Sequence, residues 1–134
     1  MGVLQSRTLS VSIDADPRAV YGFVSNPENL PRWAPGLCQA VRRVGDDWIV
    51  ETPQGPLKVQ FAAANDFGVL DHRVTGPAVD VYLPMRVVPN GAGSEVLFTL
   101  FRQPEMSDEQ YAEDARLVED DLARLKSVIE AQGR

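Results

Sequence analysis

Polar and apolar residues alternate at the start of the chain, along the segment Thr8–Ile13. The alternation places Leu9, Val11 and Ile13 on one face of an extended backbone. A period of two is typical of a β-strand with one buried face. The segment is therefore predicted as the first strand.

A short helix is predicted directly after this strand. Asp16 and Pro17 are the residue types favoured at the cap and first position of a helix, and Pro27 disfavours a helical residue before it. The next stretch, NPENLPRWAPGL, contains three prolines and predicts one further turn of helix and a sharp corner. The apolar positions of the first helix recur at helical spacing: Val20, Phe23 and Val24.

Six further runs of strand-forming residues follow, each bounded by short turn signals. The last of them follows Asn90-Gly91, a pair that readily adopts the positive φ of a hairpin turn. Because no helical pattern separates the runs, they predict an antiparallel meander and, with the first strand, about seven strands. The six runs are Cys38–Val44, Trp48–Thr52, Leu57–Ala63, Val69–Thr75, Val79–Val88 and Glu95–Arg102.

The C-terminal segment from Asp108 to about Gln132 predicts a long amphipathic helix. Ser107 and Gln110 fit a capping box at its start. About 25 residues give a length of about 37 Å, enough to cross a small domain, so the helix requires a sheet to lie on. Its apolar stripe consists of Tyr111, Ala115, Val118, Leu122, Leu125 and Ile129.

Composition narrows the class of protein. The 134 residues are 44% hydrophobic and 24% charged, which is typical of a globular chain and predicts one domain over residues 1–134. A net charge of −6 disfavours nucleic acid as a partner. No apolar run approaches the roughly 18 residues of a membrane span, and no leader pattern is present, so we expect a cytoplasmic protein without membrane insertion.

Several kinds of chemistry find no support in the residues. A single cysteine and a single histidine provide neither an internal disulfide nor a zinc cluster, so no metal is predicted. Nucleotide-binding, metalloprotease and hydrolase motifs are missing, so no cofactor is predicted. The acidic run Glu119-Asp120-Asp121 predicts a solvated helix face rather than a metal site.

The order of the predicted elements resembles the START-like superfamily, also called SRPBCC or birch-pollen-allergen-like. The stretch SVSIDADPRAVYGFVSNPENLPRW resembles its opening strand and helix pair, and VLDHRVTGP and PMRVVPNGAGSEVLFTLFRQPEMS resemble its polyketide cyclase/dehydrase-like group. The resemblance implies an α+β helix-grip fold. In that fold a curved antiparallel sheet of about seven strands surrounds the C-terminal helix, two short helices follow the first strand, and an apolar cavity lies between sheet and helix.

Three functions stay open on this basis. The first is binding of a small hydrophobic molecule, such as a lipid, an isoprenoid or a polyketide-like aromatic, in a cavity of a few hundred Å³. The second is an enzyme of the polyketide cyclase/dehydrase type that uses the same cavity. The third is a protein-interaction or stress-adaptor domain, expected if the helix packs on the sheet without a pocket. Nothing in the sequence indicates an oligomeric state.

His72 is the candidate catalytic residue. It shares its strand phase with Leu70 and Val74, which are predicted to face the helix, and an imidazole in a cavity can transfer a proton near neutral pH. The alternative is a packed, neutral histidine that hydrogen-bonds a backbone carbonyl.

Arg86 is a possible anion anchor. It shares one phase with Asp80 and Tyr82, which predicts the outer, solvated face. Pro84 favours an edge or a bulge, and a bulge would shift the phase and turn Arg86 inward toward a ligand carboxylate.

The inward strand phases and the helix stripe predict the ligand-binding residues. Trp33, Trp48 and Tyr111 are large aromatic residues that either line the mouth of the cavity or fill the core, and Cys38 is predicted to be a small buried residue. The predicted ligand contacts are Val59, Phe61, Leu70, His72, Val74, Val81, Leu83, Met85, Phe98, Tyr111, Val118 and Leu122.

Overall fold

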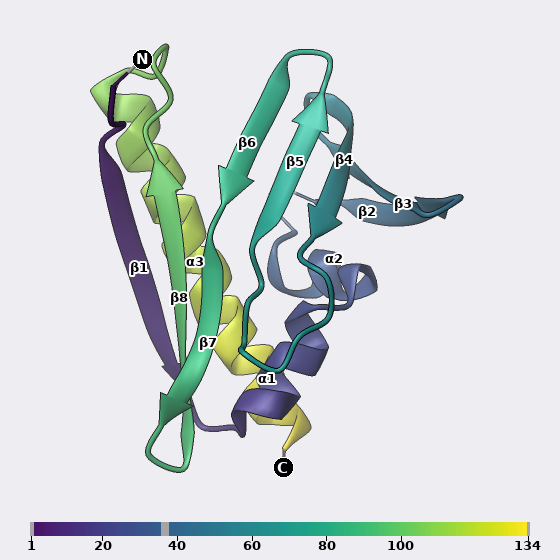
Figure 1. Ribbon diagram of the computed structural model, residues 1–134, viewed down its shortest axis with the longest axis vertical. Coiled ribbons are helices and arrows are strands. Elements are labelled where there is room, and N and C mark those ends of the chain that lie inside the picture. Colours follow the sequence, from purple (N-terminus) through teal and green to yellow (C-terminus); the bar gives the residue numbers. More distant parts are fainter. Residues whose placement is uncertain (1, 36–37, 134) are drawn as a thin grey trace.

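The computed structural model describes residues 2–35 and 38–133. These residues form two antiparallel sheets, three α-helices and one 3-10 helix, with the longest helix at the C-terminal end (Figure 1). The arrangement confirms the predicted α+β helix-grip fold. In chain order the elements are β1 (Ser6–Ile13), α1 (Pro17–Val24), η1 (Pro27–Asn29), α2 (Leu30–Trp33), β2 (Ala40–Val44), β3 (Asp47–Thr52), β4 (Gly55–Phe61), β5 (His72–Gly76), β6 (Val79–Leu83), β7 (Met85–Asn90), β8 (Gly93–Phe101) and α3 (Asp108–Gln132).

The strands form a three-stranded sheet, in the order β1-β8-β7, and a five-stranded sheet, in the order β2-β3-β4-β5-β6. The predicted strand Val79–Val88 is divided between them at Pro84, which makes eight strands rather than about seven. Proline has no N–H to donate to a neighbouring strand, so regular pairing stops there. The carbonyl of Pro84 still accepts from the Thr99 N–H at 3.0 Å. The two sheets are therefore joined through one bent stretch of chain.

A second boundary differs at the start of β5. The strand predicted from Val69 begins only at His72, because the preceding residues pair with β7 instead. The Leu70 N–H donates to the Met85 carbonyl at 2.9 Å, and the Val87 N–H donates to the Gly68 carbonyl at 3.0 Å. Gly68 has a φ of +71°, and a Cβ there would lie 2.1 Å from the Val87 carbonyl oxygen. Only glycine permits this close approach.

Helix α3 occupies the predicted residues, Asp108–Gln132. The predicted capping box is present, since the Gln110 N–H donates to Ser107 Oγ at 3.1 Å and the Ser107 N–H donates to Gln110 Oε1 at 3.0 Å. Side-chain hydrogen bonds join α3 to the three-stranded sheet: Lys126 Nζ donates to the Ser12 carbonyl at 2.8 Å, and Tyr111 Oη donates to the Leu100 carbonyl at 3.0 Å. The helix is thus fastened along one sheet.

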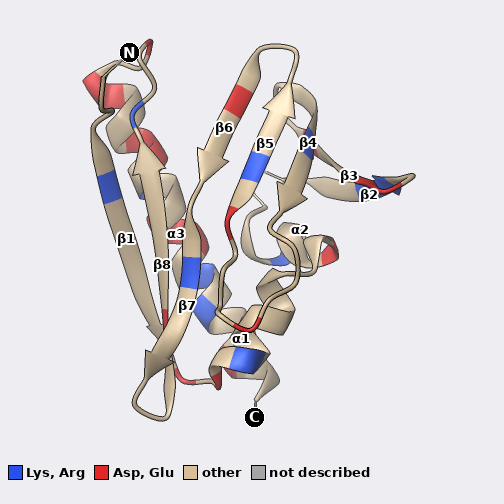
Figure 2. Ribbon diagram, in the orientation of Figure 1, with Lys and Arg blue, Asp and Glu red and all other residues tan. Residues whose placement is uncertain are grey.

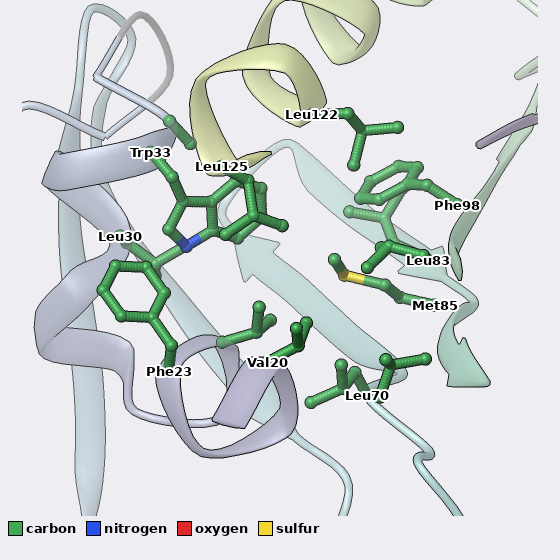
Figure 3. Packing of buried hydrophobic residues seen from close by; sticks show 14 of the residues in the cluster. Val20, Phe23, Leu30, Trp33, Leu70, Leu83, Met85, Phe98, Leu122 and Leu125 are labelled. Carbon is green, nitrogen blue, oxygen red and sulfur yellow. The ribbon is translucent and has the colours of Figure 1, made fainter. Parts of the chain in front are cut away.

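The core lies between the sheets and all three α-helices. Figure 3 shows Trp33 extending from α2 toward Leu125 of α3, with Phe23 of α1 nearby. The Trp33 side chain is 3% exposed, which confirms its predicted place in the core. Burial of large apolar side chains of this kind is the main source of stability in a domain of this size.

Charged residues are distributed along both sheets and α3. Lysine and arginine residues occur on several separate elements and do not gather on one of them (Figure 2). Among the described residues no helix is long and apolar enough to span a membrane.

Candidate functional site

A largely enclosed cavity of about 80 Å³ lies between the five-stranded sheet, β8, α2 and α3. Two larger hollows, of about 840 and 430 Å³, are open to solvent and partly walled by charged residues, so the enclosed space is the better candidate for an apolar ligand. Its volume is smaller than the few hundred Å³ expected from the sequence. The described wall residues are Leu30, Trp33, Ala34, Cys38, Val50, Thr52, Leu57, Val59, His72, Val74, Leu83, Phe98, Val118, Asp121 and Leu122.

Seven of the twelve predicted ligand contacts lie in this wall; that they bind a ligand stays a prediction. They are Val59, His72, Val74, Leu83, Phe98, Val118 and Leu122. The other five do not line the cavity, which corrects the expectation for Phe61, Leu70, Val81, Met85 and Tyr111.

These five residues miss the cavity because strand phase predicts a face of the sheet but not a position along it. Leu70 and Met85 are each 1% exposed and belong to the closely packed part of the core. Phe61 lies beside the cavity, stacked on the His72 ring, and Val81 is paired with Val74 one strand farther out. Tyr111 packs at the first turn of α3, where its hydroxyl donates to a strand carbonyl.

His72 begins β5, and its ring is part of the cavity wall. The ring stacks on Phe61 at 4.8 Å between centroids and meets Phe98 edge-on at 5.8 Å. Nδ1 lies 3.0 Å from the Leu70 carbonyl, which only accepts, so Nδ1 carries the hydrogen and Nε2 is the acceptor. Among the described residues Nε2 has no hydrogen-bond partner. Burial lowers the pKa of His72 and keeps the ring neutral, although the bond to Leu70 opposes this shift. The sequence left two interpretations of His72 open, a ring that faces the cavity and a packed, neutral ring bonded to a backbone carbonyl. The structure shows both features in one ring.

Asp121 also lines the cavity, which corrects the prediction of a solvated face for the whole acidic run. Its side chain is 16% exposed, and burial raises the pKa of its carboxyl to about 6, against the opposing charge of Arg124. Asp120, in contrast, is exposed and paired with Arg116 at 3.2 Å. Asp121 follows Val118 by three positions and therefore shares its side of the helix. This spacing of three positions is the feature of the sequence that could have predicted Asp121 in the cavity wall.

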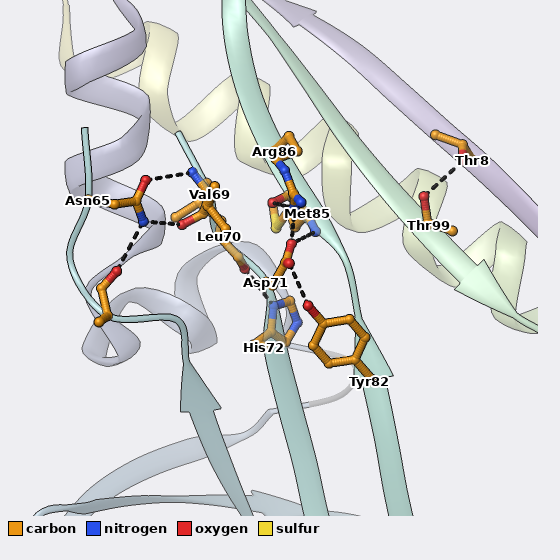
Figure 4. Close-up of polar contacts among 11 residues, drawn as sticks. Thr8, Asn65, Val69, Leu70, Asp71, His72, Tyr82, Met85, Arg86 and Thr99 are labelled. Atoms are coloured by element: carbon orange, nitrogen blue, oxygen red, sulfur yellow. Dashed lines mark hydrogen bonds and ion pairs between the residues drawn. The ribbon is translucent and has the colours of Figure 1, made fainter. Parts of the chain in front are cut away.

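Arg86 lies on the outer face, as its strand phase predicts, so the alternative in which a bulge turns it inward as an anion anchor is wrong. The interruption at Pro84 does not shift the phase: Leu83 and Met85 on either side are both buried, and Arg86 stays on the outer face. There it is paired with the carboxylate of Asp71 (Figure 4).

Asp71 is the centre of this outer cluster. It accepts hydrogen bonds from Tyr82 Oη at 2.5 Å and from the Met85 N–H at 2.9 Å, in addition to the contact from Arg86. Burial alone would raise the pKa of Asp71, but the hydrogen bonds from Tyr82 and Met85 and the charge of Arg86 outweigh burial and lower it. The cluster holds the start of β5 to the junction of β6 and β7.

The corner after α1 contributes residues to the cavity wall, and for its tryptophan the sequence had left both the cavity mouth and the core open. Trp33 is one of them, and its indole Nε1 is buried without a hydrogen-bond partner among the described residues. Cys38 is 2% exposed, as predicted for a small buried residue, and burial raises the pKa of its thiol. Trp48 is half-buried outside this wall, with the Arg43 guanidinium 5.7 Å from its ring. No periodic pattern marks so short and proline-rich a segment as part of a site.

Comparison with known protein families shows which family has this architecture. The family described as "Polyketide cyclase / dehydrase and lipid transport" matches residues 5–130. The chain belongs to this family. Membership confirms the resemblance to the polyketide cyclase/dehydrase-like group that the sequence motifs indicated. No curated protein sequence matches the chain.

Solved structures share the fold of this family member along nearly its whole length. XoxI from Bacillus cereus has a TM-score of 0.78 at 18% identity, covering 98% of this chain and 99% of that one. The Aha1 dimer from Colwellia psychrerythraea gives 0.74 at 14% identity, with 95% and 97% covered. A START superfamily protein from Mycobacterium smegmatis gives 0.71 at 15% identity, with 95% and 98% covered. At these identities the likeness establishes a START-like fold.

Proposed function

We propose that this domain binds a small, mainly apolar molecule in the cavity between the five-stranded sheet and α3. The observation that carries the proposal is an enclosed space whose described wall is apolar except for a few side chains. Such a space is typical of a small-molecule site. The family description, which includes lipid transport, and the START-like fold support the same class of ligand.

The cavity must widen to accept such a ligand, because about 80 Å³ is less than the volume of most small-molecule pockets. The attachment of α3 favours this movement. Its side-chain hydrogen bonds reach the three-stranded sheet, at Ser12 and Leu100. Across the space from the five-stranded sheet, α3 contributes the apolar side chains of Val118 and Leu122 and the single carboxylate of Asp121. Separating these side chains from the sheet exposes apolar surface that a ligand would cover again.

A ligand screen with a matched pair of variants tests the proposal. Native mass spectrometry and thermal shift would be measured with lipids, quinones and aromatic polyketides. Val118→Phe places a larger side chain in the wall and is expected to abolish binding. Val128→Phe introduces the same change on the same helix outside the wall and is expected to retain it. Failure of all three ligand classes to bind the unmodified protein would overturn the proposal.

Cys38 offers an independent measure of opening. It is the one cysteine in the chain and lies in the wall, so its reaction with a maleimide reports access to the cavity. A buried thiol with a raised pKa is expected to react more slowly than in the urea-unfolded chain. Bound ligand should slow the reaction further, and a rate that no ligand in the screen alters would count against binding at this site.

A second candidate function is an enzyme of the cyclase or dehydrase type. The observation that favours it is the neutral ring of His72 in the cavity wall, with Nε2 available to accept a proton. Purified protein would be tested on an aromatic polyketide precursor. Conversion that survives His72→Ala would exclude this mechanism.

The third candidate is an interaction or adaptor domain. The small volume of the closed cavity favours it, because α3 and the sheet are almost in contact without a ligand. Failure of the ligand screen would leave this function as the stronger one.

A further inference from the structure

The polar groups of the cavity wall carry an inference about the ligand, which rests on the proposed function. Three side chains in the described wall bear acceptor oxygen or nitrogen atoms: Thr52, His72 and Asp121. Thr52 is satisfied, since its hydroxyl donates to the Gly55 carbonyl at 2.7 Å and accepts from the Gln54 N–H at 3.1 Å. The acceptors of His72 and Asp121 are not fully satisfied by the described residues.

His72 and Asp121 both present unused acceptors. Nδ1 of His72 is occupied by the Leu70 carbonyl, which leaves the lone pair of Nε2 without a donor among the described residues. Asp121 receives one long hydrogen bond, from Arg124 at 3.4 Å to Oδ1, and its second oxygen receives none within the described chain. Acceptors that are mostly shielded from solvent gain from a donor that a ligand supplies.

We propose that the ligand is an apolar molecule with hydroxyl groups, whose O–H groups donate to Nε2 of His72 and to the carboxylate of Asp121. His72 lies on β5 and Asp121 on α3, so the two acceptors belong to opposite layers of the fold. A molecule that fills a space of this size between the layers meets both walls. Its apolar body contacts residues such as Phe98 and Leu122.

Other ligand classes fit these walls less well. A hydrocarbon leaves both acceptors unpaired. A carboxylate adds negative charge beside Asp121, and Arg86, which would have offset that charge, is on the outer face and paired with Asp71. An ammonium group matches the charge of Asp121 but must lose its hydration in an apolar cavity, whereas a neutral hydroxyl does not carry that cost.

Four single-ring probes separate these classes: phenol, toluene, benzoate and benzylamine. Their affinities would be measured by ligand-observed NMR, with protection of Cys38 from maleimide as the check on location. At about pH 8 the carboxylate of Asp121 is ionised. We expect phenol to bind about 10-fold more tightly than toluene, the ratio that one added hydrogen bond supplies. Benzoate and benzylamine are expected to bind more weakly than phenol.

Variants test which side chains cause the preference for phenol over toluene. Phenol has a single O–H and can use either acceptor, so the double variant Asp121→Leu/His72→Phe, which removes both, is expected to reduce the phenol-to-toluene ratio toward one. Asp120→Leu makes the same change at the neighbouring exposed position and is expected to leave the ratio unchanged. If a wall variant does not fold, the ratio in the unmodified protein still decides.

Two kinds of failure are distinguishable. Equal affinities for phenol and toluene, or tighter binding of benzoate or benzylamine than of phenol, would overturn the hydroxyl inference and leave apolar binding in place. Binding of none of the four probes, together with a negative screen of lipids, quinones and polyketides, would overturn both.

Discussion

Asp71 and Asp121 are both largely shielded from solvent, with side chains that are 12% and 16% exposed. At Asp71, on the outer face, donors from Tyr82 and the Met85 backbone lower the pKa of the carboxyl. At Asp121, in the cavity wall, burial raises the pKa to about 6 because Arg124 alone donates, at long range. The exposed fractions are similar, but burial acts more strongly on the Asp121 carboxyl and donors act more strongly on Asp71. Depth and the supply of donors together decide whether a carboxylate stabilises the fold or is available to a ligand.

Removing Asp71 should have the largest effect. Asp71→Ala leaves the Met85 N–H, the Tyr82 hydroxyl and the Arg86 guanidinium without their acceptor, and should lower the free energy of unfolding by about 3 kcal/mol. Urea unfolding near neutral pH measures this. Because the pKa of Asp71 is lowered, its contribution is complete above its unfolded pKa, near 4, and decreases as the pH falls below it.

Asp80→Ala is the matched control for Asp71. Asp80 forms an exposed ion pair with Arg73 at 2.8 Å on the neighbouring strand. Exposed pairs of this kind contribute at most about 1 kcal/mol. Equal losses for the two variants would contradict the difference between a shielded cluster and a surface pair.

Asp121→Asn should raise the free energy of unfolding, whereas Asp71→Ala lowers it. The raised pKa means that the folded state resists ionisation, so stability is complete below about pH 4 and is lost as the pH rises through about 6. The variant escapes this loss and should be more stable than the parent by about 2 kcal/mol near pH 8, with no gain near pH 4. Asp120→Asn is the control and should show no such pH dependence. A gain that is the same at both pH values would rule out ionisation as its cause.

Tyr82→Phe should have a smaller effect. It removes one of the donors to Asp71 and leaves the others, so a loss of about 1 kcal/mol is expected from urea unfolding. The pKa of Asp71 should rise in the variant, visible as a higher midpoint in its carboxyl carbon titration by NMR. An unchanged titration would show that Tyr82 does not contribute to holding Asp71 ionised.

The smallest expected effect concerns the tautomer and the pKa of a single side chain, His72. Because the chain has one histidine, its imidazole signals are assigned without ambiguity. Nitrogen NMR should show the hydrogen on Nδ1 and a pKa below the ordinary value near 6.5. A lowered pKa makes stability fall as the pH decreases below about 6.5, opposite in direction to Asp121. A titration at or above 6.5 would contradict burial of the ring.

Long periodic patterns predicted the fold well. The stripe of α3 extends over six apolar positions, and its cap has a side-chain signature, so the helix was found with its bounds. The divided strand was not, because Pro84 indicates a break in pairing without saying whether the chain continues in a second sheet. Its phase was nonetheless predicted, as Leu83 and Met85 both point inward.

The candidate site was predicted only in part. Alternation assigns a residue such as Val81 to the correct face, but the extent of the cavity along that face depends on how α2 and α3 pack, which is tertiary information. Asp121 was missed because three adjacent acids were treated as one surface, although successive helix positions point in different directions. The sequence left Trp33 open between the core and the mouth of the cavity. It is buried and lies in the cavity wall, and that place depends on the same packing.

The bend at Pro84 also limits how the gene for this domain can change. Leu83 and Met85 occupy alternate inward positions with a single residue between them. Deletion of that one codon would exchange the two faces of β7 relative to β6, so that Arg86 would enter the core and Met85 would leave it. Substitutions at residue 84 are therefore expected to be tolerated far more often than single-residue insertions or deletions there.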